Sequence, residues 1–266
     1  MGVKSLMSKL QGNKVKVQKD VRAGIEIEFT GVNRKYLARY LVNEGYFVES
    51  REEIHIVAGS ERTRIRMRDK RDKDWYLVVD KSIAPVITSR LSGDYDTDYM
   101  CELVSPVLEG GKDWKFLFNV LREIEFLGGV VNETCGIHIH VDAPEDTDKL
   151  KRVFTKLLSS QEKIEEKLNI QEYRLNKYTK VYPKEFCQEF SKKNSNIKTK
   201  EDLLEFVYSR LGEGVSRDDE KNPARYYMLN MDSIHKRNTI EFRMFNSTLD
   251  MGVIAGYLEW VHNFMD

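Results

Sequence analysis

Alternating apolar and polar residues predict several short strands along the chain. In segment 24–29, Ile25, Ile27 and Phe29 alternate with smaller or charged residues, which is the period of two expected of a strand with one buried face. Similar patterns predict strands at 54–57, 64–68, 75–79, 99–104, 137–142 and 239–245. Because charged turns separate the strands between residues 46 and 80, we predict a meandering antiparallel sheet there.

Apolar residues at helical spacing predict helices between these strands. Asn33 can cap a helix that Gly45 ends, and Thr199 with Asp202 resembles a capping box at the start of another. The predicted helices cover about 33–45, 114–127, 147–168, 199–210 and 251 onward.

The order of these elements predicts one domain of α+β type, a sheet with flanking helices. We find no internal repeat and no Pro- or Ser-rich linker between residues 22 and 266, so this range is expected to fold as a single domain. Residues 1–21 are polar and lysine-dotted and are expected to form an N-terminal arm. The lysine-rich stretch 171–200 is expected to be irregular, within a surface insertion or lid at about 171–217.

Composition bears on the cellular compartment of the protein and on the kinds of partner it could bind. The 266 residues contain 43 basic and 43 acidic side chains, so net charge does not favour nucleic acid or a membrane as a partner. Three scattered cysteines and the absence of a long apolar run near the start predict a cytoplasmic protein without disulfides. The basic run 62–73 could bind nucleic acid or an anionic substrate, but a solvated hairpin face balanced by acids is the favoured interpretation.

Three of the predicted strands carry chemically reactive groups on their polar face. Residues two apart on a strand point the same way and lie roughly 6.5–7 Å apart. Any one such pair is usually a solvated face, but three together indicate a metal or phosphate site of Mg²⁺ or Mn²⁺ type. The pairs are Glu26 with Glu28, His138 with His140, and Glu241 with Arg243.

Six motifs, in order, resemble those of the amidoligases, which belong with glutamine synthetase and the glutamate–cysteine ligases. The resemblance runs from about Arg22 to the end of the chain. The motifs are Gly24-Ile25-Glu26-Ile27-Glu28-Phe29, Trp75 with Asp80-Lys81-Ser82, Cys101-Glu102-Leu103-Val104-Ser105-Pro106, Cys135-Gly136-Ile137-His138-Ile139-His140-Val141, Arg225-Tyr226-Tyr227-Met228-Leu229-Asn230, and Thr239-Ile240-Glu241-Phe242-Arg243.

The resemblance implies a fold and a set of cofactors. The fold is a curved antiparallel sheet forming half a barrel, as in the catalytic domain of glutamine synthetase, with ATP at one end, substrates at the other and two or three Mg²⁺ or Mn²⁺ ions between. It implies that Glu28 shares one cation with Glu102. Glu26 is implied to share another, which bridges the nucleotide phosphates, with His138 and Glu241.

The resemblance also implies roles for residues around the metals. Arg243 would stabilise the transferring phosphoryl group and Arg225 would hold a substrate carboxylate or phosphate. Asp80 is implied either as a further ligand of the Glu28 cation or as the base that orients the amine, and Lys81 stands where relatives usually have glycine. His140, Tyr226 and Asn230 are implied to support the ligands or contact substrate.

The implied reaction is ATP-dependent amide formation through an acyl phosphate, with a small-molecule or peptide carboxylate and an amine as substrates. One alternative is a kinase of the same fold that phosphorylates a guanidino or carboxylate group. Another is a non-catalytic module that binds metal, nucleotide or nucleic acid. The apolar segment 251–265 is compatible with a core helix or with a homo-oligomer interface.

Overall fold

The computed structural model describes residues 21–57, 60–86, 97–217, 219 and 222–266. Residues 1–20 of the predicted N-terminal arm lie outside them. The strands are β1 (Arg22–Phe29), β2 (Phe47–Val57), β3 (Ser60–Asp69), β4 (Asp74–Val79), β5 (Cys101–Val104), β6 (Leu108–Glu109), β7 (Gly136–Asp142), β8 (Leu229–Asn230) and β9 (Thr239–Asn246). The helices are α2 (Arg34–Asn43), α3 (Gly110–Phe126), α4 (Thr147–Leu168), α5 (Glu172–Lys177), α6 (Lys184–Lys193), α7 (Lys200–Leu211), α8 (Ser233–Arg237) and α9 (Met251–Met265), with 3-10 turns η1 (Thr97–Tyr99), η2 (Asn194–Asn196) and η3 (Pro223–Tyr226).

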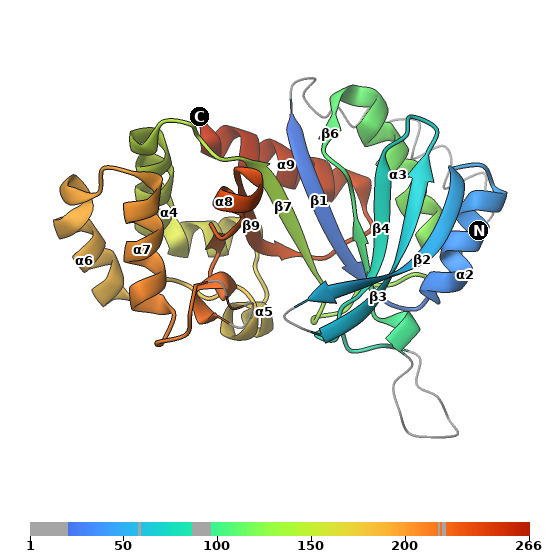
Figure 1. Ribbon diagram of the computed structural model, residues 1–266, viewed down its shortest axis with the longest axis horizontal. Coiled ribbons are helices and arrows are strands. Elements are labelled where there is room, and N and C mark those ends of the chain that lie inside the picture. The colour runs from blue at the N-terminus through green and yellow to red at the C-terminus, as the bar shows by residue number, and fades with distance from the viewer. Residues whose placement is uncertain (1–20, 58–59, 87–96, 218, 220–221) are drawn as a thin grey trace.

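Within the described residues, the strands form one 9-stranded sheet that is not closed into a barrel. The order is β2-β3-β4-β5-β1-β7-β9-β8, with β6 paired to β1, and neighbouring strands are antiparallel. The meander predicted between residues 46 and 80 is confirmed as β2, β3 and β4. The sheet twists, so that in Figure 1 the β2–β3 hairpin runs across the direction of β1.

The apolar face of the sheet packs against helices α2, α3 and α9; in Figure 1, α3 and α9 lie behind the strands and α2 lies at the right-hand edge. Ile25, Ile27 and Phe29 of β1 are each at most 1% exposed on this face. The indole of Trp260 on α9 packs edge-on against Phe242 and Phe245 of β9. Since burying one such side chain stabilises the fold by about 1.5–3 kcal/mol, this face supplies much of the core, and the opposite face is left for polar groups.

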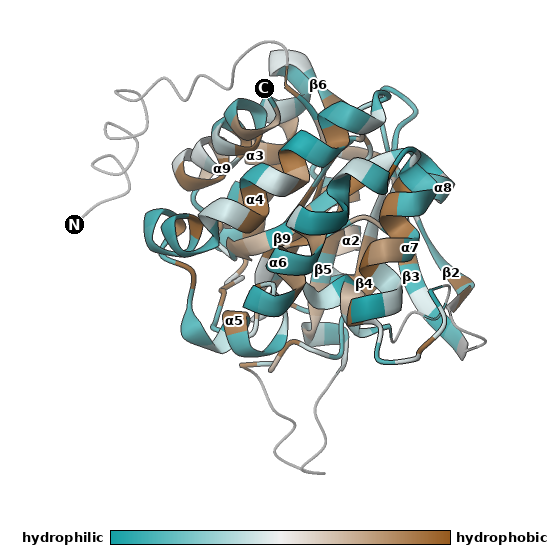
Figure 2. Ribbon diagram, turned by 90° about the vertical axis from the view of Figure 1, so that its left-hand side faces the viewer, coloured by the Kyte–Doolittle hydropathy of each residue, from teal (hydrophilic) through white to brown (hydrophobic). Residues whose placement is uncertain are grey.

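Helices α4, α6 and α7 form a second group beside β9, at the left of Figure 1. The expectation that 171–200 is irregular is wrong, because this stretch contains α5 and α6. Phe186 and Phe190, four residues apart on one helical face, both pack on Phe154 of α4. The lysines that suggested irregularity lie on the outer face, and Figure 2 shows mostly hydrophilic residues on the outer surface of α6.

Two of the predicted helix starts are confirmed by their caps, whereas the helix predicted from residue 114 begins earlier, at Gly110. The side chain of Asn33 accepts hydrogen bonds from the first turn of α2, and Thr199 and Asp202 form a reciprocal capping box on α7. Two short elements, α8 and β8, were not predicted, because five and two residues are too short for a periodic pattern to appear.

The basic run 62–73 falls on β3 and the turn after it, where acids of the neighbouring strands β2 and β4 pair with several of its arginines. Arg64 Nη2 lies 3.1 Å from Glu53 Oε2, and Arg66 Nε lies 2.8 Å from Asp74 Oδ1. These pairs fit the predicted balanced hairpin face.

Two further expectations concern the chain as a whole. The three cysteines, Cys101, Cys135 and Cys187, are free thiols. Among the residues described, no helix is both long and apolar enough to cross a membrane.

Candidate metal centre

Strand order brings the three predicted polar pairs onto one face of the sheet. β1 lies between β5 and β7, and β9 follows β7. Glu28 is directly opposite Glu102 on β5, and Glu26 is directly opposite His138 on β7. Directly opposed residues share a sheet face, so carboxylates from separate strands converge with His138 between them.

The first cluster contains Glu26, His138 and Glu241. His138 Nδ1 lies 3.0 Å from Glu26 Oε2 and 3.4 Å from Glu241 Oε1. One ligand atom from each of the three lies within 4.8 Å of the others. This is the set that the resemblance implied for the cation beside the nucleotide.

The second cluster contains Glu28, Glu102 and the same histidine. His138 Nε2 lies 3.7 Å from Glu28 Oε1, and ligand atoms of the three again lie within 4.8 Å of one another. Neutral imidazole has one lone-pair nitrogen and one N–H, so His138 can ligate a cation in one cluster while it donates a hydrogen bond to a carboxylate of the other. The two clusters are therefore coupled through one ring.

The electrostatics of these acids fit a divalent cation. Burial raises the pKa of Glu28, and burial together with the charges of Glu26 and Asp80 raises the pKa of Glu102 well above its ordinary value. Burial alone would also raise the pKa of Glu26, but the charge of His140 and the hydrogen bond with His138 outweigh it and lower that pKa well below the ordinary value. Carboxylate oxygens around an imidazole nitrogen form a donor set that suits Mg²⁺ or Mn²⁺, whose charge would relieve the mutual repulsion.

A chain of two hydrogen bonds, from Tyr208 to Asn230 and from Asn230 to Glu241, holds the Glu241 carboxylate in place. Asn230 is 3% exposed, and its Nδ2 donates a 2.7 Å hydrogen bond to Glu241 Oε2. The Tyr208 hydroxyl donates to Asn230 Oδ1 at 3.0 Å, which fixes the orientation of the amide. Of the two roles implied for Asn230, the structure therefore favours support of a ligand.

Arg243 lies at the edge of the first cluster. Its guanidinium forms an ion pair with Glu241 and lies over the ring of Tyr226, 5.9 Å from the ring centroid. Arg225, on η3, instead pairs with Asp232, with Nη2 3.3 Å from Oδ2, and keeps 24% of its side chain exposed. Arg243 is thus close to the carboxylates, whereas Arg225 stands beside them and faces solvent in part.

His140 adds a second imidazole to the Glu26 side. Its Nε2 lies 3.2 Å from Glu26 Oε1. Burial alone would lower the pKa of His140, but the charges of Glu26 and Glu241 raise it to about 8. A cavity of about 290 Å³ opens here, lined by Gly24, Glu26, Ser105, His140, Arg237 and Thr239 among others.

Asp80 lies at the opposite end, in a turn after β4. Its Oδ1 accepts a 2.7 Å hydrogen bond from the Ser82 amide, so the carboxylate stabilises its own turn. Its charge contributes to the raised pKa of both Glu28 and Glu102. Among the described residues, neither three-ligand cluster includes Asp80.

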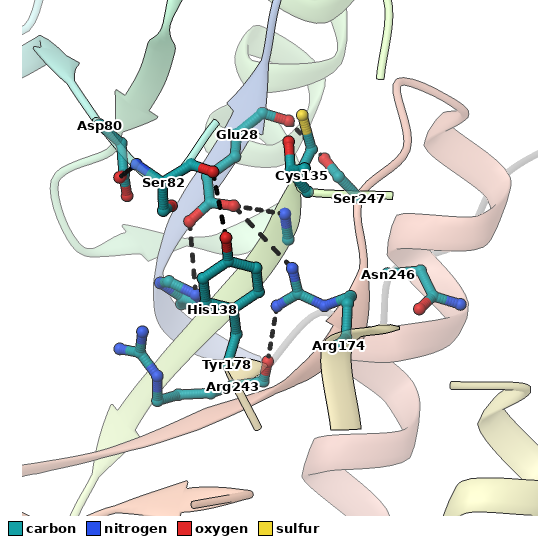
Figure 3. Close-up of polar contacts among 12 residues, drawn as sticks. Glu28, Asp80, Ser82, Cys135, His138, Arg174, Tyr178, Arg243, Asn246 and Ser247 are labelled. Atoms are coloured by element: carbon teal, nitrogen blue, oxygen red, sulfur yellow. Dashed lines mark hydrogen bonds and ion pairs between the residues drawn. The ribbon is translucent and has the colours of Figure 1, made fainter. Parts of the chain in front are cut away.

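Arg174, on α5, was missed in the sequence. It is 1% exposed, and Nη1 lies 4.0 Å from Glu28 Oε2 (Figure 3). The only local signal was Gly136, a glycine at the first position of strand β7 rather than in a turn, whose missing side chain leaves room for the guanidinium.

The comparisons with known proteins agree with the motifs. A protein-family model described as "Putative amidoligase enzyme" matches residues 19–265. No curated protein and no solved structure matches the chain.

Proposed function

This chain belongs to the amidoligase family, and on that premise we propose that it is an ATP-dependent ligase which joins a carboxylate to an amine. The observation that carries the proposal is the convergence of acidic side chains from three strands, β1, β5 and β9, around one imidazole from β7, with a guanidinium at the edge. The residues are Glu26, Glu28, Glu102, His138, Glu241 and Arg243.

The proposed reaction has two steps. A substrate carboxylate oxygen attacks the γ-phosphorus of ATP, the bond to the β-phosphate oxygen breaks, and an acyl phosphate and ADP form. A neutral amine then attacks the acyl carbon, inorganic phosphate leaves with the C–O bond electrons, and the amine loses one proton. When bound, Mg²⁺ or Mn²⁺ at the two clusters would neutralise phosphate oxygens and so favour phosphoryl transfer.

Arg243 is proposed to neutralise the charge that develops on the transferring phosphoryl group. Its guanidinium is held beside Glu241 and against Tyr226, so it need not be ordered at the moment of reaction. With 18% of its side chain exposed, it remains accessible from the face where the carboxylates lie.

The two ends of the centre suggest where each substrate binds. We assign the nucleotide to the cavity beside Glu26 and His140, because Arg237 adds positive charge there and the cavity of about 290 Å³ adjoins the first cluster. The carboxylate and amine are assigned to the other end, near Glu28. There Asp80 is the proposed group that accepts or orients an amine proton. Arg225, whose partner Asp232 adjoins Asn230 on the Glu241 side, is the proposed contact for a substrate carboxylate or phosphate.

Ligation can be tested with purified protein, ATP and Mg²⁺ or Mn²⁺. Pools of amino acids, polyamines and peptides would be added, and phosphate release and products followed by mass spectrometry. We expect a product equal in mass to carboxylate plus amine minus water, formed only with ATP. Glu241→Gln should abolish it, whereas Glu259→Gln, an exposed glutamate on α9, should not.

The other outcomes separate the alternatives. A phosphorylated acceptor without an amide would replace the ligase by a kinase of the same fold. Absence of nucleotide binding by calorimetry and of turnover with every pool would reject an enzyme and favour a binding module.

A further inference from the structure

Arg174 is a buried arginine that reaches the centre from outside the sheet. It lies on α5, within the segment between α4 and α7, yet its side chain is 1% exposed. Burial lowers the pKa of Arg174, and the carboxylate of Glu28 opposes that effect. A buried guanidinium is costly unless charged and polar partners surround it, so its contacts indicate what it does.

The first contact is with Gly136 and Glu28. A Cβ atom at Gly136 would stand 2.0 Å from Arg174 Nη2 and 2.4 Å from Cζ, so the guanidinium lies flat on this glycine. The Gly136 amide donates to Glu28 Oε2, the same oxygen that lies 4.0 Å from Arg174 Nη1. Together, the amide and guanidinium hold Oε2, while Oε1 faces His138 (Figure 3).

The second contact is with the backbone of Arg243. The β7–β9 register shifts here: Ile137 pairs with Phe245 and Ile139 with Phe242, so Arg243 and Met244 together oppose one residue of β7. Such a bulge leaves backbone groups without ladder partners and redirects a side chain. Arg174 Nη2 donates a 3.2 Å hydrogen bond to the Arg243 carbonyl oxygen, which supports the bulge.

Tyr178, the residue that follows α5, makes a further contact with the site. The Tyr178 hydroxyl donates a 3.1 Å hydrogen bond to the Ser82 carbonyl, in the turn that contains Asp80. The Tyr178 ring lies 5.9 Å from Arg174 Cζ. One short segment thus touches Glu28, the Arg243 bulge and the Asp80 turn, which are far apart in the sequence.

We propose that Arg174 is a positioning residue that fixes the Glu28 carboxylate for the cation of the second cluster and fixes the bulge that carries Arg243. It acts through these two residues, because a side chain that is 1% exposed does not reach substrate. The proposal rests on the metal-binding part of the proposed function, and it makes residues 172–178 an integral wall of the site.

Mn²⁺ binding to the metal-stripped protein, followed by electron paramagnetic resonance without nucleotide, tests this directly. We expect the wild type to bind two ions. Arg174→Met should weaken one of them about 10- to 100-fold, the usual effect of removing a group that supports a metal ligand. Arg174→Lys should recover part of the affinity, and Gly136→Ala should reproduce the loss by displacing an intact Arg174.

A double-mutant cycle identifies the ion concerned. If Arg174 acts through Glu28, Glu28→Gln with Arg174→Met should bind Mn²⁺ no more weakly than Glu28→Gln alone. With Glu26→Gln, the effect of Arg174→Met should instead persist. Arg34→Met is the matched control: Arg34 is 2% exposed and pairs with Asp98, so its loss should lower stability but leave both ions bound.

Several results would overturn the proposal. One is an unchanged Mn²⁺ affinity in a folded Arg174→Met protein. Another is a double variant, Glu28→Gln with Arg174→Met, whose loss of Mn²⁺ affinity equals the sum of the losses in the two single variants. The third is absence of Mn²⁺ binding by the wild type. If binding changes as expected but no substrate pool yields an amide, the proposed reaction is rejected and the role of Arg174 stands.

Discussion

The arginine hairpin β2–β3 and the candidate metal centre are both charged clusters on the same face of one sheet. Register places Arg64 opposite Val78, Val78 opposite Glu102, and Glu102 opposite Glu28, so one row of side chains crosses from hairpin to centre. In the hairpin Arg64, Arg66 and Arg68 each have an acidic neighbour, and Arg64 and Glu53 keep 32% and 23% of their side chains exposed.

The metal centre differs from the hairpin both in the exposure of its charged side chains and in the balance of their charges. Glu28 and Glu241 keep only 5% and 6% of their side chains exposed, and acids there face other acids. Exposed opposite charges satisfy each other and contribute about 0–1 kcal/mol, whereas buried like charges are unfavourable until a cation joins them. The comparison teaches that burial and imbalance, rather than the number of charged residues, distinguish a binding site from a solvated face.

The largest expected difference between the regions is in catalysis. Arg243→Ala should lower kcat about 1,000-fold, because it removes the guanidinium proposed to neutralise the transferring phosphoryl group. Arg64→Ala removes an equally charged side chain from the hairpin. It should change kcat less than about twofold, because an exposed ion pair contributes at most about 1 kcal/mol to stability and Arg64 is not a proposed substrate contact. Steady-state phosphate release with saturating ATP measures both, and equal losses would erase the distinction.

Metal binding should stabilise the protein only through the centre. At Mn²⁺ concentrations about 100-fold above Kd, the free energy of unfolding should rise by about 2.7 kcal/mol per site. Urea titrations with Mn²⁺ and with chelator measure the increase. Glu53→Gln should leave it intact and Glu102→Gln should reduce it; an equal increase in both variants would mean that Mn²⁺ binds elsewhere.

Without metal, the two regions should respond oppositely to loss of an acid. Glu102→Gln should raise the free energy of unfolding by about 1 kcal/mol, because a buried carboxylate beside Glu26 and Glu28 is removed. Glu53→Gln should lower it by up to about 1 kcal/mol, because Arg64 loses its partner. Urea unfolding at pH 7 in chelator compares the two variants. A Glu102→Gln protein less stable than the wild type would show that the buried carboxylates do not repel one another in the metal-free protein.

Salt should have the smallest effect, confined to the hairpin. Raising ionic strength from about 0.05 to 1 M should bring the cost of Glu53→Gln towards zero, because mobile ions screen exposed pairs over about 3 Å at 1 M. The stabilisation from Glu102→Gln should change much less, since its neighbours are buried. Repeating the chelator titrations at both salt concentrations is the test, and a hairpin effect that persists in 1 M salt would contradict it.

Much of the architecture was predictable from local patterns. Alternation identified β1, β7 and β9, and the capping residues Asn33 and Thr199 marked the starts of α2 and α7. The lysine-rich α6 was misjudged, because its apolar face consists of only a few aromatic residues, and that face is recognised only once α4 is known to pack on it.

The chain by itself determined which side chains share a face, because alternation along a strand depends only on neighbouring residues. It also carried the ordered motifs that identify the family. Only the tertiary structure decided that β1 lies between β5 and β7, that His138 stands between two carboxylate clusters, and that Arg174 fills the space above Gly136. Those arrangements depend on contacts between residues distant in the sequence, about which local periodicity carries no information.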